Sequence, residues 1–155
     1  MRLRLLTVGV AMLVLSPGLM AQQDPLIGIW KLNLAKSKFS HGPAPKSRTL
    51  KFEAAVDGLE ITADIANADG TIQHIQYTAK PDGKDYPVTG DPDRDSTTMK
   101  RIDANTTEVM GKKVGKPSVN FRRVVSKDGN TLTDTSTGTN AKGQKVNNVA
   151  VYDKQ

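Results

Sequence analysis

Four Asp-Gly pairs recur along the chain and constrain its fold more than any other feature. They stand at 57–58, 69–70, 82–83 and 128–129, and Gly90, Asn105, Gly115 and 141–143 add further turn positions. Asp-Gly is a strong hairpin signal, because the turns that join antiparallel strands need residues with positive φ. Successive turns lie about a dozen residues apart, a spacing that leaves no room for crossover helices. The spacing therefore predicts an all-β chain whose strands are joined by short hairpins.

Hydrophobic alternation between the turns supports this conclusion. Leu59, Ile61 and Ile65 share one face of a strand, and Glu60 and Thr62 lie on the other. This is the pattern of a sheet with one buried face. It predicts about ten strands in an antiparallel up-and-down meander, at 25–34, 47–55, 58–66, 71–80, 84–89, 96–103, 106–113, 117–126, 130–138 and 145–153.

A meander of this length has two edges that must be covered. Closing the sheet into a small barrel removes both of them. A two-sheet sandwich is the alternative, but sandwiches usually contain long connections that are not hairpins. The longest irregular stretch here runs only from residue 35 to residue 46. We therefore expect a closed barrel and keep the sandwich as the alternative.

The first residues are typical of an export signal. Two arginines precede an apolar run from Leu5 to Leu15, and a Ser-Pro-Gly breaker follows. The run is far shorter than the ~20 residues that span a bilayer, but it has the length of a signal-peptide core. We predict a signal peptide at 1–21, a single barrel domain at 22–155, and a periplasmic or secreted, monomeric product. No cysteine follows the run, so we expect no lipid anchor in a membrane.

Composition argues against several functions. The chain has no cysteine, which excludes thiolate zinc sites and cysteine nucleophiles. Of the 22 basic residues two lie in the leader, so the 16 acidic residues leave the mature chain with a charge of about +4. These charges are scattered, whereas nucleic-acid binding needs a dense basic stripe. We expect no nucleic-acid partner and no cofactor, and no nucleophile, phosphate-loop or zinc motif argues for an enzyme.

The two ends of the predicted barrel resemble known barrels. Gly28-Ile29-Trp30-Lys31-Leu32 resembles the Gly-x-Trp start of lipocalins, and more closely the start of fatty-acid-binding proteins. Val151-Tyr152-Asp153-Lys154 is similar to the end of the same fatty-acid-binding proteins. The resemblance implies a calycin-type β-barrel, here in an exported bacterial version.

Two features depart from that pattern. Fatty-acid-binding proteins carry an Arg two residues before the last Tyr, and the pair clamps the ligand carboxylate. This chain has Ala150 at that position. The helical lid expected after the first strand is replaced by the proline-bearing stretch at 35–46, which we expect to be an open loop. The resemblance thus implies the fold but not a fatty acid as the ligand.

Arg123 is the first candidate for ligand binding. It shares a strand face with Phe121 and Val125, and a charge among apolar neighbours is costly unless it is paired. Inside the barrel it could bind a carboxylate. Alternatively Arg122 points inward together with Asn120, or both arginines lie in solvent.

Three further residues are candidates for lining a cavity. Tyr152 and Asn148 share one face of the last strand. His74 alternates with Ile72 and Gln76 on its own strand, so it could face the same interior.

Trp30, the only tryptophan, has two interpretations. The favoured one is a core plug at the base of the barrel, with its indole covered by the stem of Arg122, Arg123 or Lys154. The other is a ligand-stacking residue.

The run of Asp91, Asp93 and Asp95 has the spacing of the first ligands of a calcium loop. Ser96 and Ile102 stand where that loop needs Gly and Glu. We therefore predict a solvated acidic turn and no metal site.

These observations favour a barrel that binds a small hydrophobic or amphipathic molecule, neutral or weakly acidic, without catalysis. The alternative is a filled barrel that acts as an interaction module for another envelope or periplasmic protein. A continuous interior cavity would favour the first function, and a packed interior would favour the second.

Overall fold

The computed structural model describes residues 23–155, so the predicted signal peptide lies outside the described residues. Ten strands and one short 3-10 helix make up this part of the chain, and no helix in it is long and apolar enough to cross a membrane. The elements are β1 (Gly28–Leu32), η1 (Leu34–Lys36), β2 (Ser47–Ala55), β3 (Gly58–Ala66), β4 (Ile72–Ala79), β5 (Tyr86–Pro87), β6 (Ser96–Arg101), β7 (Thr106–Lys113), β8 (Lys116–Val125), β9 (Thr131–Thr139) and β10 (Lys145–Lys154). The predicted all-β fold is confirmed, although β1 and β5 are shorter than expected.

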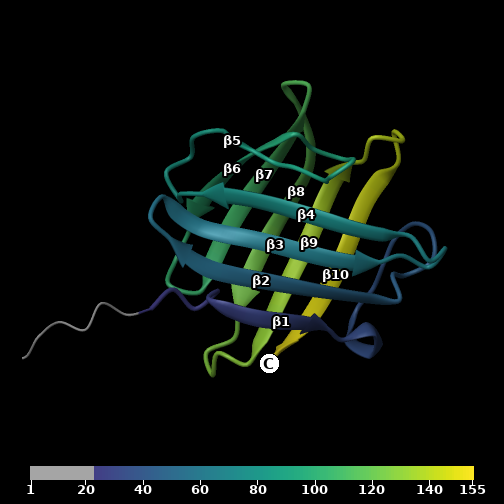
Figure 1. Ribbon diagram of the computed structural model, residues 1–155. Coiled ribbons are helices and arrows are strands. Elements are labelled where there is room, and N and C mark those ends of the chain that lie inside the picture. Colours follow the sequence, from purple (N-terminus) through teal and green to yellow (C-terminus); the bar gives the residue numbers. More distant parts are fainter. Residues whose placement is uncertain (1–22) are drawn as a thin grey trace, which may run out of the picture.

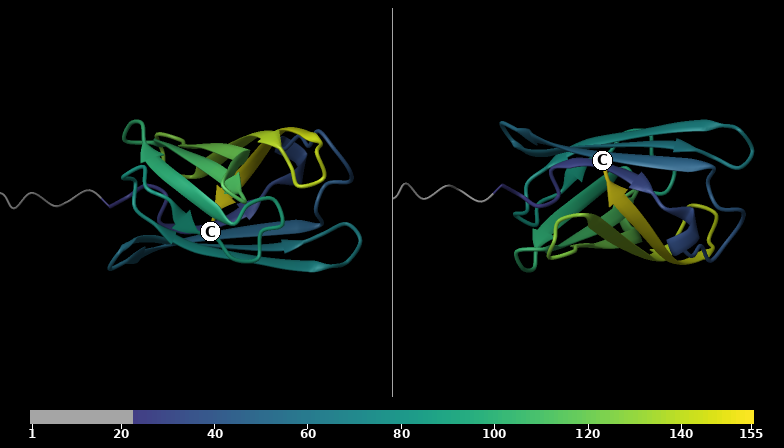
Figure 2. Two further views of the ribbon diagram at one scale, coloured as in Figure 1. Left: turned by 90° about the horizontal axis from the view of Figure 1, so that it is seen from above. Right: turned by 90° about the horizontal axis from the view of Figure 1, so that it is seen from below.

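All ten strands belong to one antiparallel sheet, in the order β4-β3-β2-β1-β10-β9-β8-β7-β6-β5. Consecutive strands are neighbours except β4 and β5, which lie at the two ends of this order, and β1 joins the two halves of the sheet because it pairs with both β2 and β10. Trp30 lies between Leu50 on β2 and Lys154 on β10. Strands β1–β4 cross over β7–β10 at a steep angle, so that the sheet curls back over itself (Figures 1 and 2). The result is a flattened barrel and not a sandwich of two separate sheets.

The barrel is nearly closed, with its seam between β4 and β5. A single isolated bridge joins the two sides within residues 23–155, through hydrogen bonds of 3.1 and 3.0 Å between the backbones of Gln76 and Thr89. Gly90 follows with a φ of +76°, and a Cβ atom there would lie 1.8 Å from the carbonyl oxygen of His74. Only glycine combines that backbone conformation with so close an approach.

Three of the four Asp-Gly pairs stand in short hairpins, at 57–58, 69–70 and 128–129. The pair at 82–83 lies instead in the longer connection between β4 and β5. Asp69 shows how these turns are held, because its carboxylate accepts hydrogen bonds from the hydroxyl of Thr71 at 2.7 Å and the amide of Thr71 at 2.9 Å. These bonds hold the pKa of Asp69 below its usual value.

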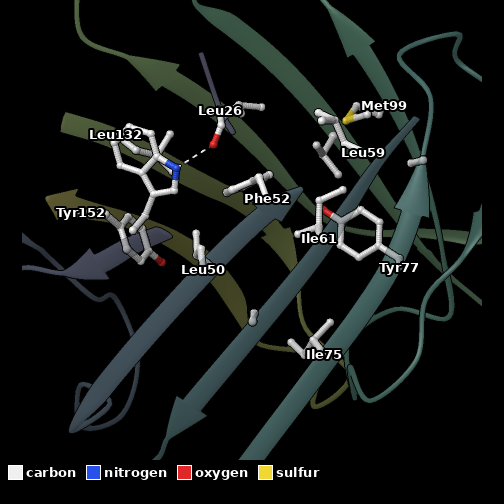
Figure 3. Packing of buried hydrophobic residues seen from close by; sticks show 14 of the residues in the cluster. Leu26, Leu50, Phe52, Leu59, Ile61, Ile75, Tyr77, Met99, Leu132 and Tyr152 are labelled. Atoms are coloured by element: carbon white, nitrogen blue, oxygen red, sulfur yellow. Dashed lines mark hydrogen bonds between the residues drawn. The ribbon is translucent and has the colours of Figure 1, made fainter. Parts of the chain in front are cut away.

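Trp30 closes one end of the barrel. It is fully buried, and its indole Nε1 donates a hydrogen bond of 2.8 Å to the carbonyl oxygen of Leu26 (Figure 3). The ammonium group of Lys154 lies 5.0 Å from the centre of the indole ring. The interpretation of Trp30 as a core plug under a basic stem is confirmed. The buried side chains packed into the same end include Leu26, Phe52, Leu59, Met99, Val109, Val125 and Leu132.

Candidate ligand cavity

The other end of the barrel is hollow. A cavity of about 500 Å³ lies between β2–β4 and β8–β10, and the loops at 40–42, 91–94 and 140–144 surround its mouth. Pockets for small molecules commonly measure ~300–1,000 Å³. None of the side chains named above at the packed end lines this space. Its apolar wall includes Leu50, Ile61, Ala63, Ile65, Ile75, Val119 and Val146.

Arg123 lies inside the barrel, where the alternation of β8 places it with Phe121. Its side chain is 3% exposed. Nε donates to Oδ2 of Asp134 at 3.3 Å, and Nη1 donates to the hydroxyl of Tyr77 at 2.9 Å. The guanidinium also lies 5.3 Å from the ring centre of Phe52 and 5.7 Å from that of Phe121. A buried charge is tolerated here because it is paired, hydrogen-bonded and stacked on aromatic faces.

Arg94 reaches the same cavity from the loop between β5 and β6. Its side chain is 4% exposed, and Nε donates to Oδ2 of Asp91 at 2.7 Å. The guanidinium lies 5.0 Å from the ring centre of Tyr77 and 4.6 Å from that of Phe121. Gly111 leaves the space for the stem, since a Cβ atom there would lie 3.1 Å from Cδ of Arg94. The barrel wall is thus shaped to admit this side chain.

Arg48 enters from β2 and is half-buried. It donates from Nη1 to the hydroxyl of Tyr152 at 3.3 Å, and it makes no ion pair with any described carboxylate. The resemblance to fatty-acid-binding proteins places an arginine at position 150, next to Tyr152. Here position 150 is alanine, and the guanidinium beside Tyr152 comes from β2 instead.

Burial and charge act in opposite directions on the pKa values of these groups. Burial lowers the pKa of Arg123, but the attraction of Tyr77 and Asp134 outweighs it and the pKa is raised overall. Burial also lowers the pKa of Arg48, which Tyr152 more than offsets. Burial raises the pKa of Tyr152, and Arg48 opposes this only in part. At neutral pH both guanidinium groups are therefore charged, and the Tyr152 hydroxyl keeps its proton.

The cavity wall carries one net positive charge. Its four basic side chains are Arg48, Arg94, Arg123 and Lys142, and its three acidic ones are Asp91, Asp93 and Asp134. Asp91 and Asp134 each pair with a buried arginine, which leaves Arg48 as the interior charge without a carboxylate partner in residues 23–155. Such a wall is suited to an anion with an apolar body.

Three of the four predicted site residues lie together in this cavity: Arg123, Tyr152 and Asn148. Of the alternatives for the arginine pair, Arg123 points inward. Arg122 points outward and forms a surface ion pair with Glu108 at 2.5 Å. The alternation along β8 had left this choice open.

Asn148 stands at the mouth and fixes a loop. Its Oδ1 accepts hydrogen bonds from the backbone amide of Ser40 at 2.7 Å and from the Ser40 hydroxyl at 2.9 Å. These bonds tie the 35–46 stretch to β10. That stretch is a loop, as predicted, apart from η1 at its start.

The expected placement of His74 in the cavity is wrong. Its ring is 58% exposed on the outer face of β4, and Nδ1 lies 2.6 Å from Oδ1 of Asp64. The inward residues of β4 are Gln73, Ile75, Tyr77 and Ala79, and the first three of them line the cavity. Side chains alternate between the two faces of β4, so His74 lies on the outer face, in solvent.

The acidic run after Gly90 also differs from its prediction as a solvated turn. Asp91 is buried against Arg94. Asp93 accepts a hydrogen bond of 2.8 Å from the amide of Ala141, and Asp95 accepts one of 2.8 Å from the amide of Val114. The three carboxylates hold three different segments, and the described residues contain no group of three potential metal ligands.

Neither Arg48 nor Arg94 was singled out from the sequence. Arg48 did carry a signal, since it alternates with the buried Leu50 and Phe52, just as Arg123 does with its apolar neighbours. Arg94 lies in a loop without periodicity, and no pattern around it indicates that it turns inward.

No protein-family profile matches the sequence, and no curated protein matches it. Among solved structures, the fold is similar to that of zebrafish ileal bile acid-binding protein complexed with cholic acid. The TM-score is 0.49 and the identity 11%, over 84% of this chain and 99% of that one. This likeness is too slight for any property of that protein to be transferred here, and the description of the barrel rests on its own strand pairing.

Proposed function

We propose that the mature chain is an exported, monomeric, non-enzymatic barrel that holds one small hydrophobic or amphipathic molecule in its cavity. The observation that carries the proposal is the cavity of about 500 Å³ at one end of a barrel whose other end is packed. A barrel that served only as a scaffold would gain stability by filling this space. The apolar run at residues 5–15 supports export to the periplasm or the medium.

The interaction-module alternative requires a filled interior, and the cavity weighs against it. The ionisable groups inside the barrel are also paired in a way that keeps them charged. Both buried carboxylates, Asp91 and Asp134, are ion-paired with arginine. Pairing of this kind favours a fixed charge and not the transfer of a proton. This supports a binding role over a catalytic one.

A dye titration tests the proposal. The protein is expressed from its full sequence, purified without detergent and titrated with anilinonaphthalene sulfonate. We expect saturable binding of one dye molecule per chain, because the cavity is apolar and of the right size. Ala63→Phe, which places a ring in the cavity, should weaken dye binding at least tenfold.

Thr62→Phe is the matched control, since Thr62 is the adjacent residue on β3 and lies outside the cavity lining. Its dye affinity should equal that of the wild type. If the wild type does not bind the dye, or if Ala63→Phe binds it as well as Thr62→Phe does, the cavity is not a binding site.

A further inference from the structure

Two arginine side chains in the cavity wall each have one buried N–H donor without an acceptor. These donors are Nε of Arg48 and Nη1 of Arg94, and neither has a hydrogen-bond partner among residues 23–155. Both side chains line the cavity. A buried donor without an acceptor is unfavourable, and one on a charged group more so. An anionic group in the cavity would place a counter-charge beside these incompletely paired guanidinium groups.

Arg48 and Arg94 line the same cavity, together with Asp91. Arg94 holds the carboxylate of Asp91 at 2.7 Å, and Asp91 is also among the charges that act on Arg48. Among residues 23–155, the Arg48 side chain makes one hydrogen bond, to the hydroxyl of Tyr152. Since that hydroxyl oxygen accepts from Arg48, its own hydrogen is available as a third donor.

The charge balance limits the ligand to one negative charge. The interior contains three guanidinium groups, of Arg48, Arg94 and Arg123, against the two carboxylates of Asp91 and Asp134. A single anionic group neutralises this excess. A second negative charge on the ligand would have no counter-charge in the apolar part of the cavity and would have to be desolvated at a large cost.

The cavity volume limits the size of the ligand. The space of about 500 Å³ equals the liquid volume of roughly 16 water molecules at ~30 Å³ each, and covalently bonded atoms take less room than separate waters, so a molecule of two or three rings fits. With an anionic head group at the arginines, the wall formed by Leu50, Ile75 and Val119 would be left for an apolar body.

We propose that the ligand is a compact, singly charged acid whose anionic head group binds the guanidinium groups of Arg48 and Arg94. This rests on the proposed function, since it names the class of molecule that the cavity takes. Arg48 is the residue that sets this specificity, because its charge has no carboxylate partner in the described part of the chain.

Calorimetric titration with three matched probes tests the proposal. The probes are 2-naphthoate, the neutral 2-naphthol and the doubly charged 2,6-naphthalenedicarboxylate. We expect 2-naphthoate to bind at least tenfold more tightly than either of the others. Equal affinity for 2-naphthoate and 2-naphthol would overturn the proposed acid specificity but leave a binding cavity. If none of the three binds, the acid proposal is overturned, and the dye titration decides separately whether the cavity is a binding site.

Arg48→Met isolates the role of Arg48. The substitution keeps most of the apolar stem and leaves no carboxylate unpaired, so the fold should persist. It should weaken 2-naphthoate binding at least tenfold and leave 2-naphthol binding unchanged. Arg122→Met, which removes an outward arginine, should alter neither affinity. An equal loss for both probes in Arg48→Met would assign Arg48 a structural role only. If the variant does not fold, the comparison of probes on the wild type still decides the proposal.

Discussion

Replacing Trp30 with alanine is expected to lower the free energy of unfolding by about 3–5 kcal/mol. Trp30 is fully buried and is the largest side chain at the packed end. The substitution leaves a void between β1, β2 and β10, and it removes the donor to the Leu26 carbonyl oxygen. Urea unfolding followed by circular dichroism measures the effect, since the variant has no tryptophan to report by fluorescence.

Two controls separate packing from polar contacts at this end. Trp30→Phe keeps an aromatic ring in place and should cost less than Trp30→Ala. Lys154→Ala removes a cation at 5.0 Å from the indole, a contact of about 0.5–1 kcal/mol at an exposed site. A Trp30→Ala variant with wild-type stability that had merely lost ligand binding would contradict the role of Trp30 as a core plug.

Replacing Arg123 with methionine is expected to destabilise the barrel by about 3–5 kcal/mol, because Asp134 is left as a buried charge without its partner. The Arg123 guanidinium pairs with Asp134 and also donates to Tyr77. One substitution therefore removes the counter-charge of a carboxylate and the donor to a buried hydroxyl. Urea unfolding of this variant gives the size of the loss.

The double variant Arg123→Met, Asp134→Leu tests the reason for that loss. It removes both charges, and apolar pairs often replace buried ion pairs at little cost. We expect it to recover most of the stability that Arg123→Met loses. A double variant less stable than Arg123→Met would show that the cost lies in lost packing around Arg123 and not in the unpaired charge of Asp134.

The strands follow from local signals, and the sequence therefore predicts most of the fold. Asp-Gly turns and alternation of polar and apolar residues act over a few residues each, so they can be recognised without tertiary structure. The short β5 and the seam beside it cannot be. They depend on how Gly90 passes the backbone of His74, which is a contact between segments far apart in the chain.

The prediction that His74 faces the interior is wrong because His74 lies near the mouth of the barrel, where polar and apolar residues do not separate by face. Ile72 begins β4 next to a hairpin and is 74% exposed, while Gln73 points into the cavity. The mouth is polar, so hydrophobicity there does not report which face is inside. Farther along β4 the buried Ile75 and Tyr77 restore the usual relation.

The sequence predicts some of the charged residues of the cavity. An arginine that alternates with buried apolar residues is a usable signal, which identified Arg123 and also applies to Arg48. The inward turn of Arg94 is not encoded locally, because it depends on the space beside Gly111 on another strand. The signal peptide and the site of export stay predictions.

Chemical-shift mapping by NMR with ¹⁵N-labelled protein and saturating 2-naphthoate tests the central claim most directly. That claim is that one end of the barrel is packed and the other binds a small acid. We predict shifts for the side-chain Nε–H groups of Arg48 and Arg94 and the backbone amides of Tyr77 and Phe121, with the indole N–H of Trp30 unmoved. Shifts at the Trp30 indole, with none at the arginines, would contradict that claim.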